Sequence, residues 1–113
     1  MSNVFTTTSP LGYTVSCTQV RWDNHILRGH ENMRGREDTV SNTVANPQWV
    51  FQSDEFPSRD VYFSKSGHTN EKLMFVKVIV ETDTCCDAEV VSAWMQPKVS
   101  GNIGVIKHVN PKL

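Results

Sequence analysis

The sequence lacks the long apolar runs that mark membrane and secreted proteins. No stretch approaches the roughly 20 apolar residues that span a bilayer. The N-terminal sequence MSNVFTTTSP has neither the basic region nor the apolar region of a secretion signal. Both absences favour a protein that stays where it is made, and we expect a cytoplasmic location.

The sequence also lacks an excess of positive charge. Its 11 lysine and arginine residues are balanced by 12 aspartate and glutamate residues, and the formal net charge is −1 at pH 7. Proteins that bind nucleic acid are usually basic, because contacts with phosphates dominate the affinity. Any binding of nucleic acid must therefore depend on a local patch of basic residues.

Cofactor-binding motifs and paired cysteines are absent as well. The sequence contains no GxGxxG, P-loop or GxSxG motif, so nucleotide-dependent and α/β-hydrolase chemistry are disfavoured. Cys85 and Cys86 are adjacent, and a disulfide between neighbouring residues strains the backbone. No CxxC spacing includes them or Cys17, so structural zinc is disfavoured too. We expect reduced thiols and no cofactor.

The 113 residues suit a single domain. Alternation of Tyr13, Val15 and Cys17 predicts a strand. Thr18 can then cap a helix that runs to Gly29, where glycine could adopt the left-handed conformation. A second helix is predicted over residues 36–45, with acidic residues in its first turn and Asn-Pro after its end.

From residue 48 the hydrophobic period changes to two. Strands are predicted over residues 48–53, 60–65, 73–81 and 88–95, and residues 102–109 could add an edge strand or lie along the sheet as a tail. Helices followed by strands indicate an α+β fold. We expect two N-terminal helices packed on one face of a mainly antiparallel sheet of about four to five strands.

His25 and His30 raise the question of a metal site or an acid–base site. Five residues apart, they would point about 140° from each other on a continuous helix, unlike the i,i+4 pair of a zinc-binding HExxH motif. His30 lies beyond the predicted helix end and near Arg34 and Arg36, where a histidine could transfer protons close to a phosphate. Alternatively, either histidine only bonds the last helix carbonyls.

The predicted strands carry polar residues within apolar rows. Met74, Val76, Val78 and Val80 should form one apolar face, while Lys77 interrupts the opposite face between Phe75 and Ile79. Ser92 is expected to share a face with Val90 and Trp94. Lys77 and Ser92 could bind a phosphate or hydroxyl group. The alternatives are a lysine that extends to solvent and a serine that is satisfied locally.

Arg59 and Tyr62 lie near the start of the strand predicted at residue 60. An arginine offers a planar fork to a phosphate, and a tyrosine can stack on a base or donate a proton. The alternatives are an ion pair from Arg59 to Asp54 or Glu55 and simple packing of Tyr62. We expect the three tryptophans to be mainly core residues. His68 and His108 are expected at the surface.

The order of these motifs resembles the phage-type barnase–EndoU–colicin–RelE-like (BECR-fold) nuclease group. That group tends to show a helix with a "W..HI…H.E" pattern, a second helix that closes in "NP", and a strand with a "TA(Y)"-like motif. The matching residues are Trp22, His25, Ile26, His30, Glu31, Asn46, Pro47, Arg59, Tyr62 and Ser92–Trp94. The resemblance covers about residues 13–96 and leaves 97–113 as a C-terminal tail. Asn32 replaces a frequent proline, and "SAW" replaces a threonine-containing motif.

The resemblance implies a metal-independent endoribonuclease that acts as a toxin or phage-related effector and that an antitoxin or immunity protein inhibits. His30 and His25 would be the acid–base residues, assisted by Tyr62 and Ser92, and the RNA phosphates would contact Arg59, Lys77 and Arg34. An alternative is a non-catalytic protein-binding module of the same fold, either an inhibitor or an assembly partner, which the near-neutral charge favours. A metal-dependent hydrolase is a third alternative.

Overall fold

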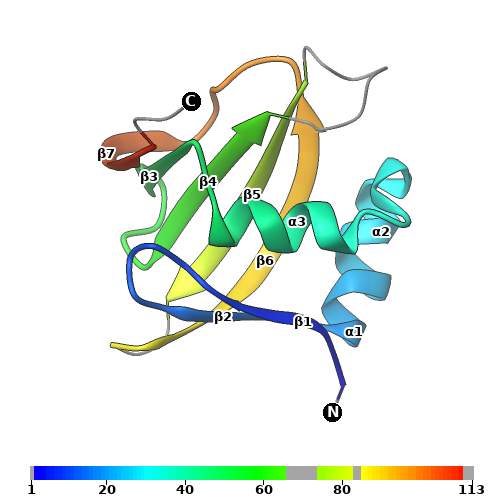
Figure 1. Ribbon diagram of the computed structural model, residues 1–113. Coiled ribbons are helices and arrows are strands. Elements are labelled where there is room, and N and C mark those ends of the chain that lie inside the picture. The colour runs from blue at the N-terminus through cyan, green and yellow to red at the C-terminus, as the bar shows by residue number, and fades with distance from the viewer. Residues whose placement is uncertain (1, 66–73, 83–84, 111–113) are drawn as a thin grey trace.

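The computed structural model describes residues 2–65, 74–82 and 85–110. Within these residues, one seven-stranded sheet has the order β1-β2-β6-β5-β4-β3-β7 (Figure 1). The strands are β1 (Asn3–Thr8), β2 (Thr14–Thr18), β3 (Trp49–Ser53), β4 (Arg59–Lys65), β5 (Phe75–Thr82), β6 (Asp87–Gln96) and β7 (Ile103–Val109). The helical elements are α1 (Gln19–Arg21), a π-helical turn (Trp22–Ile26), α2 (Leu27–Gly29), a 3₁₀ turn (Glu31–Met33) and α3 (Glu37–Ala45).

The sheet is mixed. β3, β4, β5 and β6 form an antiparallel meander, and β7 returns to pair with the outer side of β3. The hairpin of β1 and β2 joins the other side, where β2 runs parallel to β6 and Val15 lies opposite Ala88. A connection through the helices and three strands, β3, β4 and β5, therefore separates the neighbouring strands β2 and β6.

The helix after β2 begins as the sequence predicts and then changes geometry. The Thr18 hydroxyl accepts a hydrogen bond from the Arg21 amide at 3.1 Å, which confirms the predicted cap. The Leu27 amide bonds to the Trp22 carbonyl, and this wider π turn lets both side chains be buried. Gly29 does not adopt the predicted left-handed conformation. The chain instead leaves the helix at His30, whose φ is −141°.

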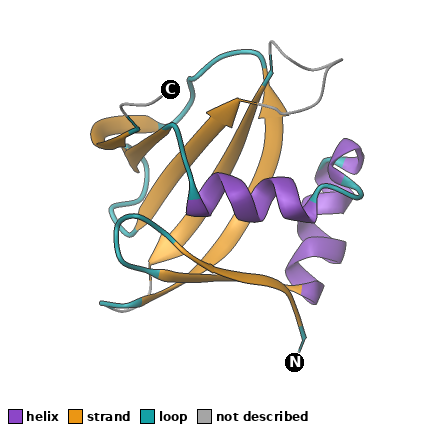
Figure 2. Ribbon diagram, in the orientation of Figure 1, coloured by secondary structure: helices purple, strands orange, loops and turns teal. Residues whose placement is uncertain are grey.

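Helix α3 lies across one face of the sheet (Figure 2). Its buried residues Val40 and Val44 pack into the same core as Val76, Val78 and Val80 of β5, which confirms the predicted apolar face of that strand. Met74, just before β5, is partly buried against this core. The helix ends at Ala45, and its cap residue Asn46 immediately precedes Pro47, which cannot supply the next amide donor.

The predicted fold class is wrong. The sheet has seven strands rather than about four to five, and the parallel pair of β2 and β6 makes it mixed, although its other five pairs are antiparallel. Helix α3 covers the sheet face, whereas the broken helix of residues 19–29 stands to one side of the sheet, against β6 (Figure 1). The threonine-rich strand β1 was not predicted, because NVFTTT has too few apolar residues to show a clear period.

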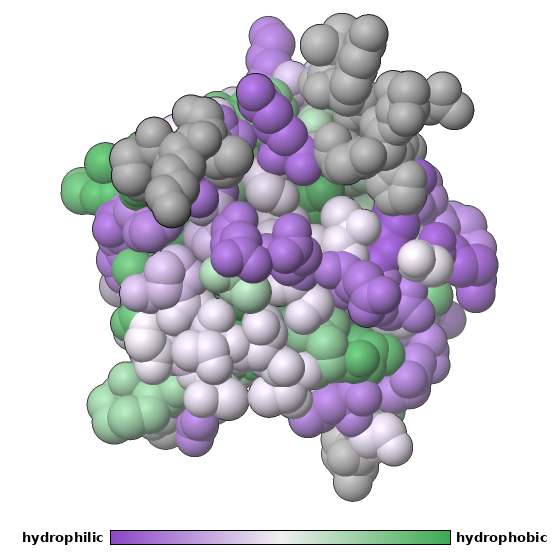
Figure 3. Space-filling view, viewed as in Figure 1, coloured by the Kyte–Doolittle hydropathy of each residue, from purple (hydrophilic) through white to green (hydrophobic). Residues whose placement is uncertain are grey.

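The segment 102–109, expected as an edge strand or a tail, contains β7. Its side chains Val105, Ile106 and Val109 are exposed by 75%, 46% and 51%. Apolar atoms appear at this edge, on the left of the space-filling view (Figure 3). Among the described residues, no helix is long and apolar enough to cross a membrane.

The three cysteines are free thiols in two different environments. Cys17 is completely buried, and this burial, together with nearby Glu89, raises the pKa of its thiol to about 12. Cys85 and Cys86 are exposed in the turn before β6, where the neighbouring Cys85 thiol raises the pKa of Cys86.

We therefore expect a thiol reagent to modify two cysteines in the folded protein at mildly alkaline pH. The third should react only after denaturation, because a buried thiol of high pKa is neither accessible nor ionised. Mass spectrometry of the labelled protein with and without guanidinium measures this directly. Rapid modification of Cys17 in the folded protein would contradict the burial of β2.

Candidate functional site

A row of aromatic and basic side chains crosses the sheet on the face opposite α3. Trp49, Phe63, Lys77 and Trp94 come from four successive strands, and each is the register partner of the next. Register partners on neighbouring strands point to the same face. Val76 and Val78, which flank Lys77 in the strand, face the α3 core. Lys77 and the rest of the row therefore face away from that core. We call these four residues the aromatic row.

Lys77 lies at the centre of the aromatic row and is only 2% exposed. Its ammonium donates hydrogen bonds to the carbonyls of Ser100 and Gly101, at 3.1 and 2.8 Å. The same nitrogen lies 4.9 Å from the centre of the Trp94 ring and 5.7 Å from that of Phe63. Burial lowers the pKa of Lys77, and Asp54 partly opposes this effect. The alternative of a solvent-facing lysine is therefore wrong.

His30 continues the aromatic row beyond β6. Its imidazole stacks on the Trp94 indole with ring centres 5.2 Å apart and planes at 21°. The indole nitrogen of Trp94 donates to the Gln96 side chain at 2.9 Å, which fixes the orientation of the ring. Partial burial lowers the pKa of His30, and the charge of His25 lowers it further. His30 is therefore mainly neutral at pH 7 and can accept a proton.

Residues 97–102, which we call the strap, lie over this part of the sheet. The Gln96 side chain donates to the carbonyls of Lys98 and Ser100, and the Asn102 carbonyl accepts from the Asp54 amide. Gly101 has φ +91°, and a β-carbon there would lie 2.8 Å from the Lys77 ammonium nitrogen. The strap thus needs glycine at this position for both its backbone conformation and its close approach to Lys77.

Ser92 lies on the same face as Lys77, two register pairs further along the strands. It pairs with Ile79, and the register shifts between Ile79 and Val80, so that Val90 pairs with Val80 and packs in the α3 core. The prediction that Val90 shares a face with Ser92 and Trp94 is therefore wrong. An extra residue in β6 reverses the alternation at this point, which a count along the sequence does not reveal.

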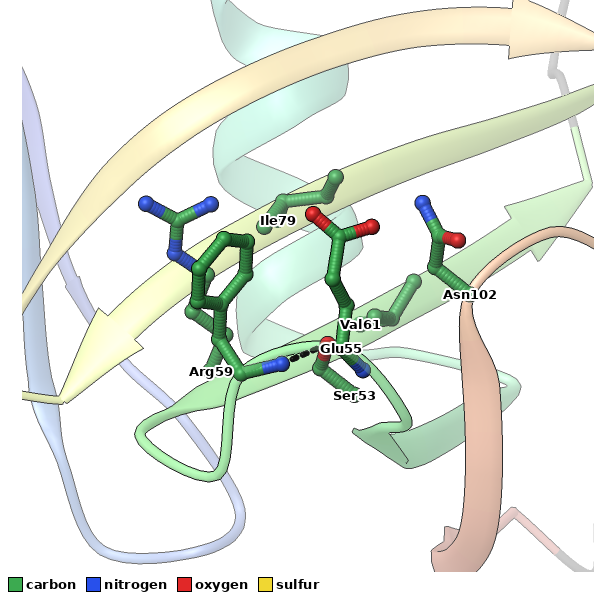
Figure 4. A pocket seen from close by; sticks show the side chains of 7 residues that line it. Ser53, Glu55, Arg59, Val61, Ile79 and Asn102 are labelled. Carbon is green, nitrogen blue, oxygen red and sulfur yellow. Dashed lines mark hydrogen bonds between the residues drawn. The ribbon is translucent and has the colours of Figure 1, made fainter.

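Arg59 borders a shallow hollow on the same face, at the other end of β4 (Figure 4). The hollow is lined by Ser53, Glu55, Phe56, Arg59, Val61, Ile79 and Asn102. Arg59 donates to Glu81 at 2.9 Å, and its guanidinium lies 4.2 Å from the centre of the Phe56 ring. The predicted ion pair with Asp54 or Glu55 is replaced by this bond to Glu81.

Arg59 and Lys77 start from well-separated positions on this face. Arg59 lies opposite Glu81, and Lys77 lies opposite Phe63, so four residue positions separate the two side chains along the strands. At about 3.3 Å per residue, this separation is about 13 Å. The two cations could contact different phosphates of one extended strand.

Tyr62 does not belong to this face. Its side chain is fully buried in the α3 core, and its hydroxyl donates to the Ser9 hydroxyl at 2.6 Å. Burial raises the pKa of Tyr62 to about 12. Arg59 and Tyr62 are three residues apart on one strand, so their side chains point to opposite faces. The predicted catalytic role of Tyr62 has no support in this arrangement.

We expect Tyr62→Phe to leave any catalytic activity unchanged and to lower the free energy of unfolding by about 1 kcal/mol. The substitution removes one neutral hydrogen bond and keeps the packing of the ring. Urea unfolding, measured beside an activity assay, tests both parts. A large loss of activity without loss of stability would instead support a catalytic role for Tyr62.

His25 and Arg34 also lie outside the aromatic row. His25 is exposed and borders a separate hollow with Thr18, Val20, Arg21, Asn24 and Glu89. Arg34 is exposed and forms a two-point ion pair with Glu31, at 2.7 and 3.2 Å. His108 lies on β7 opposite Val50, and His68 falls outside the described residues.

Two features of this face were missed from the sequence. Trp22 is a core residue as expected, but Trp49 and Trp94 lie in the aromatic row rather than in the core. No local sequence pattern singles out Phe63 or the strap. Only the register between strands brings these residues to Lys77, so hydrophobic alternation within a single strand could not have found them.

Within the described ranges, no group of three or more histidine, cysteine, aspartate or glutamate side chains is arranged to hold a metal ion. The arrangement instead offers a neutral imidazole, a flat indole surface and an ammonium group in one row. The chain was compared with protein-family models, with curated proteins and with solved structures, and none of the three comparisons gave a match.

Proposed function

We propose that the protein is a small metal-independent endoribonuclease of the BECR-fold group, which cleaves RNA by acid–base transesterification. The single observation that supports this proposal best is the arrangement of His30, Trp94 and Lys77. A proton acceptor, a stacking surface and a cation lie side by side on one sheet face. A base and a charge-stabilising cation are two of the groups that cleavage of RNA without a metal requires.

In the proposed reaction, neutral His30 takes the proton of a ribose 2′-hydroxyl. The 2′-oxygen attacks the adjacent phosphorus, and the bond from phosphorus to the 5′-oxygen breaks, which leaves a 2′,3′-cyclic phosphate. The departing 5′-oxygen takes a proton from water. The Lys77 ammonium and the Ser92 hydroxyl stabilise the charge on the phosphate oxygens, while Arg59, about 13 Å further along the strands, binds a more distant phosphate of the same RNA.

The proposal requires the strap to move. In the structure, the carbonyls of Ser100 and Gly101 accept hydrogen bonds from the Lys77 ammonium, and Lys77 is almost inaccessible to solvent. An RNA phosphate would replace these two carbonyl oxygens as the acceptor. The exchange is chemically matched, because a phosphate oxygen is a stronger acceptor than a carbonyl for a charged donor.

An active ribonuclease of this kind implies a partner. Free in the cytoplasm, it would cleave the RNA of the cell that makes it, so we propose a toxin or phage-related effector that an inhibitory protein neutralises. Our second candidate is a non-catalytic protein-binding module. The burial of Lys77 beneath the strap and the net charge of −1 favour this second candidate.

Incubation of purified protein with single-stranded RNA in EDTA separates the two candidates. The ribonuclease should cleave in chelator and produce fragments that end in a 2′,3′-cyclic phosphate, which mass spectrometry identifies. The absence of cleavage over a wide range of pH and salt would favour the binding module. Cleavage that EDTA abolishes would contradict the mechanism and favour a metal-dependent hydrolase.

A further inference from the structure

A second cleft lies near the C-terminal end of α3, where β4 ends. It has a volume of about 330 Å³, which is within the range of small-molecule sites. Its lining consists of Asn42, Asn46, Gln48, Ser64, Lys65 and Asn110. The lining thus contains four carboxamides, one hydroxyl and one ammonium group. None of these described lining residues is a carboxylate, and this composition suits a neutral or anionic ligand with several hydrogen-bonding groups.

The polar groups of the cleft are held in place by the fold. Asn46 donates to the Asn42 side-chain oxygen at 3.0 Å, which leaves the amide group of Asn42 and the oxygen of Asn46 for other partners. The Ser64 hydroxyl shares a 2.7 Å hydrogen bond with Thr43. The Gln48 backbone bonds to Phe63 and Asn110 on either side. Apart from the Gln48 side chain, these groups therefore need little reorganisation to bind a ligand.

Gln48 carries an unsatisfied polar atom in this setting. The residue is only 6% exposed, and its side-chain oxygen is buried without a hydrogen-bond partner. A buried polar group left unpaired costs about 1–3 kcal/mol, so natural proteins keep few of them. Rotation of the carboxamide about its last torsion exchanges the oxygen and the nitrogen, and a ligand donor in the cleft could then pair with the oxygen.

We propose that this cleft binds an adenine base, with Lys65 beside the phosphate of the same nucleotide. Asparagine and glutamine carboxamides pair with adenine through one donor and one acceptor each. Lys65 is exposed at the rim and supplies the cation. This inference deepens the proposed function and rests on it, because in RNA the cleft would be a base-recognition subsite. The cleft lies on the α3 side of the sheet, where Ser64 bonds to Thr43, so an RNA strand would have to pass around the sheet to reach both this cleft and the aromatic row.

Titration of the full chain with adenosine monophosphate, followed by NMR of the side-chain amides, tests the proposal. We expect the carboxamide signals of Asn42, Asn46 and Gln48 to shift in a saturable manner at millimolar ligand. Adenosine should bind about tenfold more weakly, because it lacks the phosphate that Lys65 contacts. Uridine monophosphate should also bind more weakly, and glucose should cause no shift.

Variants locate the site. Asn46→Ala and Gln48→Leu should each weaken binding of adenosine monophosphate by about tenfold, whereas Asn24→Ala removes a carboxamide from a different hollow and should leave binding unchanged. Asn46 is exposed, so its variant should fold even if Gln48→Leu does not. Lack of saturable shifts in the unmodified protein, or equal binding of glucose, would overturn the inference. This assay contains no RNA cleavage step. A failure to bind adenosine monophosphate is therefore distinguishable from a failure to cleave RNA.

Discussion

Replacing His30 with alanine is expected to reduce RNA cleavage by about 100-fold or more, because general-base catalysis contributes roughly that amount. His30 is the one imidazole among the described residues that stacks on Trp94. The matched control is His108→Ala, which removes an imidazole from β7 and should retain activity. Added imidazole should partly restore the His30→Ala variant, since a small base can enter the space that the side chain leaves.

The pH dependence of cleavage should identify His30 as the base. A base must be neutral to accept a proton, so the rate should fall as the pH drops through the pKa of His30. Burial and the charge of His25 hold this pKa below its usual value of 6.5. Removal of His25 as His25→Ala abolishes one of these effects, so the acid limb of the profile should move to higher pH.

Two results would count against this role. One is an unchanged acid limb in His30→Gln that is still fully active. The other is a loss of activity in His30→Ala that is matched by a large loss of folding stability and is not restored by imidazole. The stacking contact alone is worth only about 0.5–1.5 kcal/mol, so the variant should remain folded. Urea unfolding of the same preparation measures this.

Replacing Lys77 with methionine is expected to lower the free energy of unfolding by about 3 kcal/mol, with a fall in melting temperature of about 10 °C. Methionine fills the space between the Phe63 and Trp94 rings but cannot donate hydrogen bonds. The carbonyls of Ser100 and Gly101 would therefore lose a charged donor in a buried position. The strap should become more accessible, which hydrogen exchange of its amides would report.

Lys98→Met is the matched control for this experiment. Lys98 belongs to the same strap, but its side chain is exposed, so the substitution should change stability by less than about 0.5 kcal/mol. A Lys77→Met variant as stable as Lys98→Met would show that the ammonium does not hold the strap. In the ribonuclease, Lys77→Met should also lower cleavage even though it opens the strap, since the phosphate loses its cation.

The parts of the fold that the sequence predicted are those that a local pattern determines. Thr18 caps the first helix, Asn-Pro ends α3, and the alternation of Val76, Val78 and Val80 defines the buried face of β5. Each depends on residues close together in the chain. The parallel pair of β2 and β6 depends on distant residues and has no local signal, so the mixed sheet was not foreseen.

The candidate site shows the same division. Lys77 and His30 were identified because each is unusual in its local setting, but their connection through Trp94 requires the register between β5 and β6. The prediction that Tyr62 belongs to the site is one that the sequence itself argues against. A spacing of three on a strand puts Tyr62 on the face opposite Arg59. The extra residue in β6 was not predictable, since bulges have no reliable sequence signature.

The parallel pairing of β2 with β6 also sets when a newly made chain can complete its fold. Roughly 70 residues lie between the paired positions Thr14 and Asp87. At about 5–20 residues per second, a ribosome needs about 4–15 s to make this stretch, during which the β1–β2 hairpin has no neighbour on its inner side. The stacking contact of His30 likewise cannot form until Trp94 has been synthesised. A cell that makes the protein would therefore meet the assembled face only after nearly all of the strands had left the ribosome.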